Sequence, residues 1–299
     1  MDNRSEIRQF LATRRAKITP QQAGLPAYGG NRRVAGLRRE EVAMLAGVSV
    51  EYYARLERGN LSGASEGVLE ALARALHLDE AEREHLFDLA RAANTTARTP
   101  PRRRAVQQVR PAIQRILDAM SDAPAFIRNG RLDILTANRL GYALYAPVFA
   151  NPARPANLAR FRFLDPLSTG FYPDWDDSAN TTVALLRTEA GRDPYDRALS
   201  DLVGELSTRS DEFRVRWAAH NVRLHHTGVK RFHHPVVGDL SLAFEAMPLP
   251  ADPGLTLTAY SAEPGSASHD GLRLLASWAA TLDQTGQPEA AHAADEHTA

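Results

Sequence analysis

The stretch that decides the fold is LRREEVAMLAGVSVEYYARLERG, residues 37–59. It divides into two short helices at Gly47, which suits the tight turn of a helix-turn-helix motif. Ala43 is small at the point where the two helices would cross. Ser49 is a good N-cap for the second helix, and Tyr53 anchors that helix inward. Because turn, cap and inward positions agree, the stretch predicts a helix-turn-helix rather than a generic helical bundle.

The outward positions of the second helix are the candidates for contact with base edges in a DNA major groove. They are Ser49, Val50, Glu51, Tyr52 and Arg55. An Arg can pair bidentately with guanine and a Glu can accept from cytosine N4. An exposed ion pair between Glu51 and Arg55, four residues apart, is the alternative. Arg38 and Arg39, at the start of the first helix, are candidates for phosphate contacts or for a solvated helix face.

The charge distribution agrees with nucleic-acid binding by the N-terminal part. The whole chain has 36 basic and 36 acidic side chains, but residues 1–104 hold 18 basic and 13 acidic ones. Nearly all of the positive charge is Arg, whose planar fork suits phosphate and guanine. With no Cys in its 299 residues, the chain has no disulfide, thiolate nucleophile or Cys-based zinc site.

The organisation of the chain predicts two domains. Helical patterns fill the first part, and we place an all-α, five-helix DNA-binding domain at residues 1–95. A polar, Pro- and Arg-rich linker follows at 96–110, where Arg102, Arg103 and Arg104 favour a solvated linker over a phosphate-tracking segment. A second domain covers 111–282. Residues 283–299 have nothing to bury and are expected to form a disordered tail.

The second domain shows both helical and strand periodicity, which predicts an α+β fold with an antiparallel sheet. Helical stripes include Ile113, Ile116, Leu117 and Met120, and a helix starting near Ser178 after a loop that holds Asp176 and Asp177. Period-2 alternation appears at Ile134 and Thr136, at Val222 and Leu224, from Leu240 to Ala246, and at Leu255 and Leu257. Turn signals at Thr227-Gly228, at Gly238-Asp239 and at 250–254 join the late strands into a meander.

At the phrases GVS and RLERG the chain resembles the lambda-repressor-like (XRE-type) regulators. The resemblance implies base contacts by Val50, Glu51 and Arg55 and phosphate contacts by Arg38 and Arg39. A departure is the long insert at residues 19–36, between the first two helices. That insert and the phrases NTTVALLRTEAGRDP, LVGELSTRSDEF, WAAHNV and HHPVVGDL resemble the MmyB-like regulators, over about residues 7–275.

This second resemblance implies a PAS-like ligand-binding domain with a cavity for a hydrophobic small molecule, a long-chain fatty acid being one class. The expected cavity is closed and apolar, with few polar groups. A carboxylate head in such a cavity needs a charge-assisted partner. The candidates are Arg128, Arg131, Arg160 and Arg162. Trp217 and His220 are also candidates, with a structural core role as the alternative, and Asn138 either touches ligand or caps the helix that follows it.

Other functions find less support in the sequence. Five His residues lie between positions 220 and 234, but neighbours on a strand point to opposite faces, so no metal site is expected. No nucleophile elbow, Walker motif or dinucleotide fingerprint occurs, so we expect no enzyme and no cofactor. Without a signal peptide or an apolar span, a cytoplasmic protein with no membrane partner is expected.

The leading hypothesis is therefore a homodimeric regulator that binds a near-palindromic operator in double-stranded DNA and senses an apolar metabolite. The alternative is a DNA-binding protein whose C-terminal domain is a ligand-free dimerisation or partner-docking module.

Overall fold

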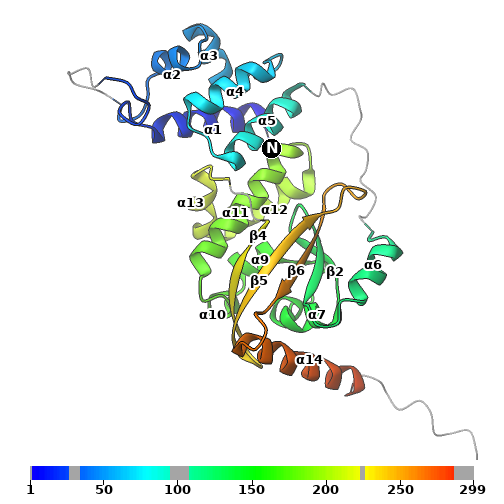
Figure 1. Cartoon of the computed structure of the whole chain (residues 1–299). Helices are drawn as coiled ribbons and strands as arrows, with labels where there is room; N and C mark the ends of the chain where they lie inside the picture. The colour runs from blue at the N-terminus through cyan, green and yellow to red at the C-terminus, as the bar shows by residue number, and fades with distance from the viewer. Residues whose placement is uncertain (1, 27–33, 95–107, 223–225, 286–299) are drawn as a thin grey trace, which may run out of the picture.

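The computed structural model describes residues 2–26, 34–94, 108–222 and 226–285, and it contains a helical bundle and a mixed domain (Figure 1). The bundle consists of five helices around one hydrophobic core. They are α1 (Asn3–Lys17), α2 (Arg39–Leu45), α3 (Val50–Glu57), α4 (Glu66–Ala75) and α5 (Glu80–Asn94).

Local sequence signals explain where the bundle helices begin. The side chain of Ser49 accepts a hydrogen bond from the backbone N–H of Tyr52, and Ser65 caps α4 in the same way. Gly47 ends α2 with a φ of 66°, a left-handed conformation that favours glycine. Ala43 and Tyr53 are fully buried, as the sequence predicted.

The mixed domain is built on a six-stranded sheet in which every paired neighbour is antiparallel, in the order β3-β2-β1-β6-β5-β4. The strands are β1 (Ala125–Asn129), β2 (Asp133–Ala137), β3 (Ala156–Asn157), β4 (Thr227–His234), β5 (Gly238–Pro248) and β6 (Leu255–Ser261). The α and α+β halves agree with the predicted fold class. The description of the second half as PAS-like stays a prediction.

Helices cover the sheet and also form a separate block. One sheet face packs on α7 (Arg139–Leu144), α8 (Ala146–Phe149), α10 (Leu167–Phe171) and α14 (Ala267–Thr285). The other face packs on α6 (Pro111–Asp118). A second core unites α9 (Leu158–Leu164), α11 (Trp175–Arg192), α12 (Arg197–Arg209) and α13 (Asp211–Ala218). Figure 1 shows α11 between the bundle and the sheet, and α11 contacts α5 directly.

The late strands confirm the predicted meander. Residues of β5 alternate between exposed and buried from Asp239 to Ala246, and β4, β5 and β6 pair in sequence. The predicted turn at Thr227-Gly228 is wrong, because both residues belong to β4. The turn predicted at Gly238-Asp239 lies at residues 235–237 instead, because Gly238 and Asp239 already belong to β5. The strand predicted to include Val222 is also wrong: Val222 lies outside the sheet and packs in the core of the helical bundle. Leu224 lies outside the described residues.

Three further expectations need correction. Asp176 and Asp177 lie in the first turn of α11, which begins at Trp175, and acidic residues are favourable at that position. Ile116 is 59% exposed, so the buried face of α6 is narrower than predicted. Helix α14 extends to Thr285, three residues into the range expected to be a disordered tail. The rest of that range and Arg102, Arg103 and Arg104 lie outside the described residues.

Candidate functional sites

The helix-turn-helix presents one exposed face of α3. Val50 is 42% exposed, Glu51 and Arg55 are exposed, and Tyr52 is half-buried. Ser49, also exposed, is committed to capping α3 through a 3.1 Å hydrogen bond from the backbone N–H of Tyr52. The guanidinium of Arg55 lies 4.9 Å from the centre of the Tyr52 ring, which holds it on the outward face.

The two Arg residues at the start of α2 have different surroundings. Arg38 is half exposed and approaches the carboxylate of Glu40 at 3.3 Å. Arg39 donates to Glu57, a buried carboxylate that also accepts from Arg15 at 2.6 Å. The hydrogen bond from Arg39 to Glu57 raises the pKa of Arg39. Arg39 therefore remains charged at the protein surface, 58% exposed, with its orientation fixed by Glu57.

A basic groove next to α3 was missed by sequence reasoning. It has a volume of about 530 Å³ and is lined by Asp2, Arg4, Ser5, Arg8, Arg55, Arg58 and Asn60. Gly59 permits this close approach of α3 to α1, since a Cβ there would lie 2.3 Å from the carbonyl oxygen of Arg4. The sequence did contain one indication of this groove: Arg4 and Arg8 are four residues apart and therefore lie on the same face of a helix.

The mixed domain contains a small cavity between the sheet and α11. Its volume is about 40 Å³. Apolar side chains line part of it, but three cations also line it: Arg128 of β1, Arg162 of α9 and Lys230 of β4. Hydroxyl groups come from Tyr145, Tyr172, Ser178, Thr181, Thr182, Thr258 and Tyr260. The expectation of an apolar cavity with few polar groups is therefore wrong for this lining.

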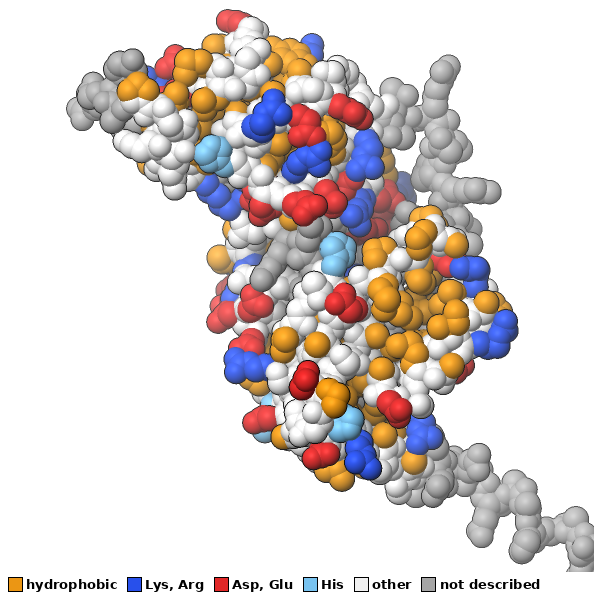
Figure 2. Space-filling view, viewed as in Figure 1, with side chains coloured by type: hydrophobic (Ala, Val, Ile, Leu, Met, Phe, Trp, Pro, Cys, Tyr) orange, Lys and Arg blue, Asp and Glu red, His pale blue; other side chains and the backbone are white. Residues whose placement is uncertain are grey.

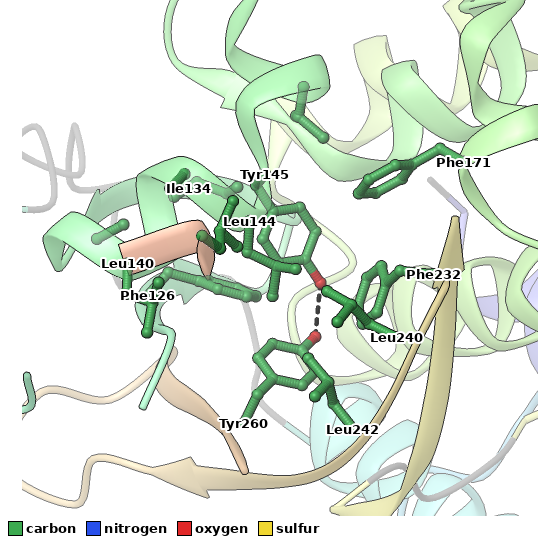
Figure 3. Packing of buried hydrophobic residues seen from close by; sticks show 14 of the residues in the cluster. Phe126, Ile134, Leu140, Leu144, Tyr145, Phe171, Phe232, Leu240, Leu242 and Tyr260 are labelled. Atoms are coloured by element: carbon green, nitrogen blue, oxygen red, sulfur yellow. Dashed lines mark hydrogen bonds between the residues drawn. The ribbon is translucent and has the colours of Figure 1, made fainter. Parts of the chain in front are cut away.

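Aromatic rings pack closely beside the cavity. The hydroxyls of Tyr145 and Tyr260 are 2.5 Å apart and form the hydrogen bond drawn in Figure 3. Phe126 and Phe232 contact the ring of Tyr145 edge to face. Burial raises the pKa of both tyrosines, so their hydroxyls remain protonated donors.

The cations of the cavity lie in a strongly desolvated environment. The guanidinium of Arg162 stacks 3.2 Å from the centre of the Tyr172 ring, and Lys230 Nζ lies 5.5 Å from the same centre. Burial lowers the pKa of Lys230 to about 7, and the charges of Arg162 and Arg128 contribute in the same direction. Burial also lowers the pKa of Arg128 and of Arg162. The cavity is therefore a site of positive potential in a medium of low dielectric.

Of the predicted ligand residues, the structure brings only Arg128 and Arg162 into this cavity lining. Arg160 binds Glu205 at 2.8 Å, and Arg131 binds Asp133 and Asp196. Asn138 accepts from the backbone N–H of Gly141, so it caps α7, which was the structural alternative. The sequence did not point to Lys230 as a ligand residue. Buried and exposed residues do not alternate clearly in the first half of β4, where Lys230 lies.

Trp217 and His220 lie instead where the two domains meet. The guanidinium of Arg187, fully buried, donates to Glu6 of α1 and to the backbone carbonyl of Trp217. The same guanidinium lies 2.8 Å from Nδ1 of His220. Arg14 of α1 donates a 2.5 Å hydrogen bond to the carbonyl of His220. These residues connect α11 and the segment after α13 to the first helix of the bundle.

The electrostatics of this interdomain cluster favour an ionised Glu6. Burial opposes ionisation, but the hydrogen bond with His220, the nearby ring of His85 and the charge of Arg187 outweigh it, so the pKa of Glu6 lies well below its usual range. Arg192 at the end of α11 binds Asp88 of α5 at 3.2 Å. Figure 2 shows acidic and basic side chains gathered along this boundary.

Comparison with protein families identifies the two halves. Residues 109–275 match the MmyB-like transcription regulator ligand binding domain, and residues 8–86 match a helix-turn-helix domain. The chain belongs to the MmyB-like transcription regulators. It is a DNA-binding transcription regulator with a ligand-sensing domain. No curated protein sequence matches the chain significantly.

The described residues of this regulator include neither a membrane-spanning helix nor a metal-binding cluster. No described helix is both long and apolar enough to cross a membrane. Among the described His, Asp and Glu side chains, no group of three is arranged to hold a metal ion. His233 and His234 lie on opposite faces of β4, one exposed and one buried, as expected for neighbours on a strand.

Proposed function

We propose that the regulator binds a near-palindromic operator as a homodimer and that an apolar molecule with an anionic head, held in the cavity of the mixed domain, alters its affinity for DNA. A long-chain fatty acid is one class of such a molecule. Val50, Glu51 and Arg55 would contact bases, while Arg38 and Arg39 would contact phosphates.

The observation that carries the proposal is the position of α11. Its first half lines the cavity through Ser178, Thr181 and Thr182. Its second half binds the DNA-binding domain through Arg187 and Arg192. A ligand that shifts α11 would therefore act directly on α1 and α5, and through them on the orientation of α3.

The buried cations argue against the ligand-free alternative. Desolvated charges are costly, and a module that served only for dimerisation would gain stability from apolar side chains at Arg128 and Arg162, which are 9% and 3% exposed. The small volume of the cavity has a second consequence. Drug-sized ligands occupy about 300 to 1,000 Å³, so side chains must move before a long acyl chain can enter.

Titration of the purified full-length protein with fatty acids of increasing length tests this function. Each buried methylene contributes about 0.8 kcal/mol, so the melting temperature should rise with chain length until the cavity is filled. Operator affinity, measured by fluorescence anisotropy, should change in parallel. Stabilisation with unchanged operator affinity would remove the regulatory role, while mass spectrometry of extracted lipid would show what the protein carries from the cell.

A further inference from the structure

The charge of the cavity lining exceeds what one carboxylate can neutralise. Arg128, Arg162 and Lys230 line the cavity, and within the described residues no Asp or Glu does. Asp177 attracts Lys230 and Glu189 attracts Arg128 from outside the lining. Asp177 is exposed, so solvent screens its effect. Glu189 is half-buried and offsets part of the charge of Arg128, whereas a bound anion favours the protonated form of Lys230. About two positive charges therefore face the cavity when an anion is bound, and a monocarboxylate would neutralise one of them.

Buried polar atoms without partners among the described residues also belong to the cavity lining. In the described part of the chain, Nε and Nη1 of Arg162, Oγ of Ser178 and Oγ1 of Thr181 have no hydrogen-bond partner. These three residues are 3%, 8% and 5% exposed, so bulk solvent does not reach them and a partner for these atoms must lie in the cavity itself. Buried polar atoms normally have partners, which indicates a missing acceptor.

We propose, building on the ligand-sensing function above, that the physiological ligand carries a doubly charged phosphate monoester head on a short apolar group. The guanidinium forks of Arg128 and Arg162 match phosphate oxygens, and a bound dianion would favour the protonated form of Lys230, which then adds its charge. A phosphate ester has three terminal oxygens and nearly two negative charges at neutral pH. The cavity of about 40 Å³ must widen to admit this ligand too, and a short apolar group, which would lie against Phe126, Leu158 and Phe244, requires less widening than a long chain.

Three probes of equal chain length separate the charge of the head from its shape. They are an alkyl phosphate, an alkyl sulfate and a fatty acid, titrated into the full-length protein by calorimetry slightly above neutral pH. The sulfate matches the tetrahedral phosphate but carries a single charge. We expect the phosphate to bind about thirtyfold more tightly than the sulfate, since a lost buried charge pair costs at least about 2 kcal/mol.

The outcomes distinguish this proposal from the wider function. If the alkyl phosphate and the alkyl sulfate bind equally, or if the fatty acid binds more tightly, the proposal of a doubly charged head is wrong. The proposed function as a sensor of an anionic apolar ligand would still stand. Inorganic phosphate that binds as tightly as the alkyl phosphate would overturn the apolar group. Absence of binding by every probe would overturn both the proposal and the cavity as a ligand site.

Lys230→Met separates a ligand-binding lysine from a structural one. Lys230 is half-buried but its ammonium is desolvated, so its removal should raise the melting temperature of the free protein at neutral pH and weaken alkyl phosphate binding about thirtyfold. Arg160→Met is the matched control, because Arg160 shares α9 with Arg162 but binds Glu205 away from the cavity. A Lys230→Met variant that is less stable and binds alkyl phosphate normally would contradict the assignment.

Discussion

At the scale of single residues, Arg55 and Arg39 are expected to act on DNA in different ways. Arg55→Ala should cost about 1 to 3 kcal/mol of operator affinity and relax the preference at one base pair, because the guanidinium of Arg55, stacked on the Tyr52 ring, lies on the outward face of α3. Arg39→Ala should weaken binding to all DNA sequences. It should also lower the slope of log affinity against log salt concentration by about one, because one phosphate contact is lost. Arg15 remains on Glu57 in that variant, so the fold is retained.

Anisotropy titrations with operator and unrelated DNA at several salt concentrations measure both effects. Arg273→Ala is the control of equal charge change, since Arg273 is exposed on α14, at the end of the molecule far from α3 (Figure 1). Identical losses for Arg55→Ala and Arg39→Ala on both DNAs would refute the distinction between base and phosphate contacts.

Lys230 predicts a pH dependence for the stability of the ligand-free protein. Its pKa falls from 10.5 to about 7 on folding, through burial and the charges of Arg162 and Arg128, with exposed Asp177 opposing them. Between these pH values the unfolded chain binds more protons than the folded one. Stability from this group therefore rises with pH across that window, by up to about 1 kcal/mol per pH unit.

Urea unfolding of the natural protein and of Lys230→Met across this window checks the expectation. The stability advantage of the variant should be largest near pH 7 and should shrink as pH rises toward 10.5. A constant difference between the two proteins would show that Lys230 does not change its protonation on folding.

At the scale of elements, helix α11 is the mechanical connection between the two domains. Glu6→Gln should destabilise the protein by about 3 to 5 kcal/mol at neutral pH, because it leaves the buried guanidinium of Arg187 without its carboxylate. The pKa of Glu6 is depressed on folding, so its contribution is present above pH 4.5 and is lost as pH falls below that value. The difference between the two proteins should shrink in the same range.

Chemical unfolding at several pH values measures this contribution, and Glu70→Gln is the matched control. Glu70 pairs with Arg83 on the surface of the bundle, so its replacement should change stability little. If ligand still stabilises Glu6→Gln but no longer changes operator affinity, α11 carries the coupling. Unchanged coupling in a stable variant would place the route elsewhere.

The elements also show how far the sequence could predict this structure. Strand β5 was predictable because one face is buried and the other exposed. Strand β1 was not, since all five of its residues are buried and no alternation remains. The helix caps Ser49, Ser65 and Asn138 were visible as local signals.

Sequence signals for the candidate sites were likewise local. Arg128 and Arg162 stood out as Arg residues within an apolar domain, but their meeting with Lys230 depends on the pairing of distant strands and helices. Val222 follows a strand-like pattern and yet packs in the core of the other domain. Such contacts between domains leave no periodicity in the sequence, so the role of Arg187 and His220 required the structure.

At the scale of the whole molecule, the number of base-reading side chains predicts a dimer. Helix α3 presents Val50, Glu51 and Arg55 as its outward candidates, too few contacts for the usual specific affinity of a regulator. Two copies bound to half-sites about one helical turn apart would double them. We therefore expect a near-palindromic footprint and two chains per operator in sedimentation experiments, with DNA binding abolished when residues 1–95 are removed.

A chain without residues 283–299 serves as the deletion control and should bind normally, because most of that range lies beyond α14. Protection of a single asymmetric half-site by one chain would contradict the dimer, and it would require the basic groove beside α3 to supply the missing affinity through phosphate contacts.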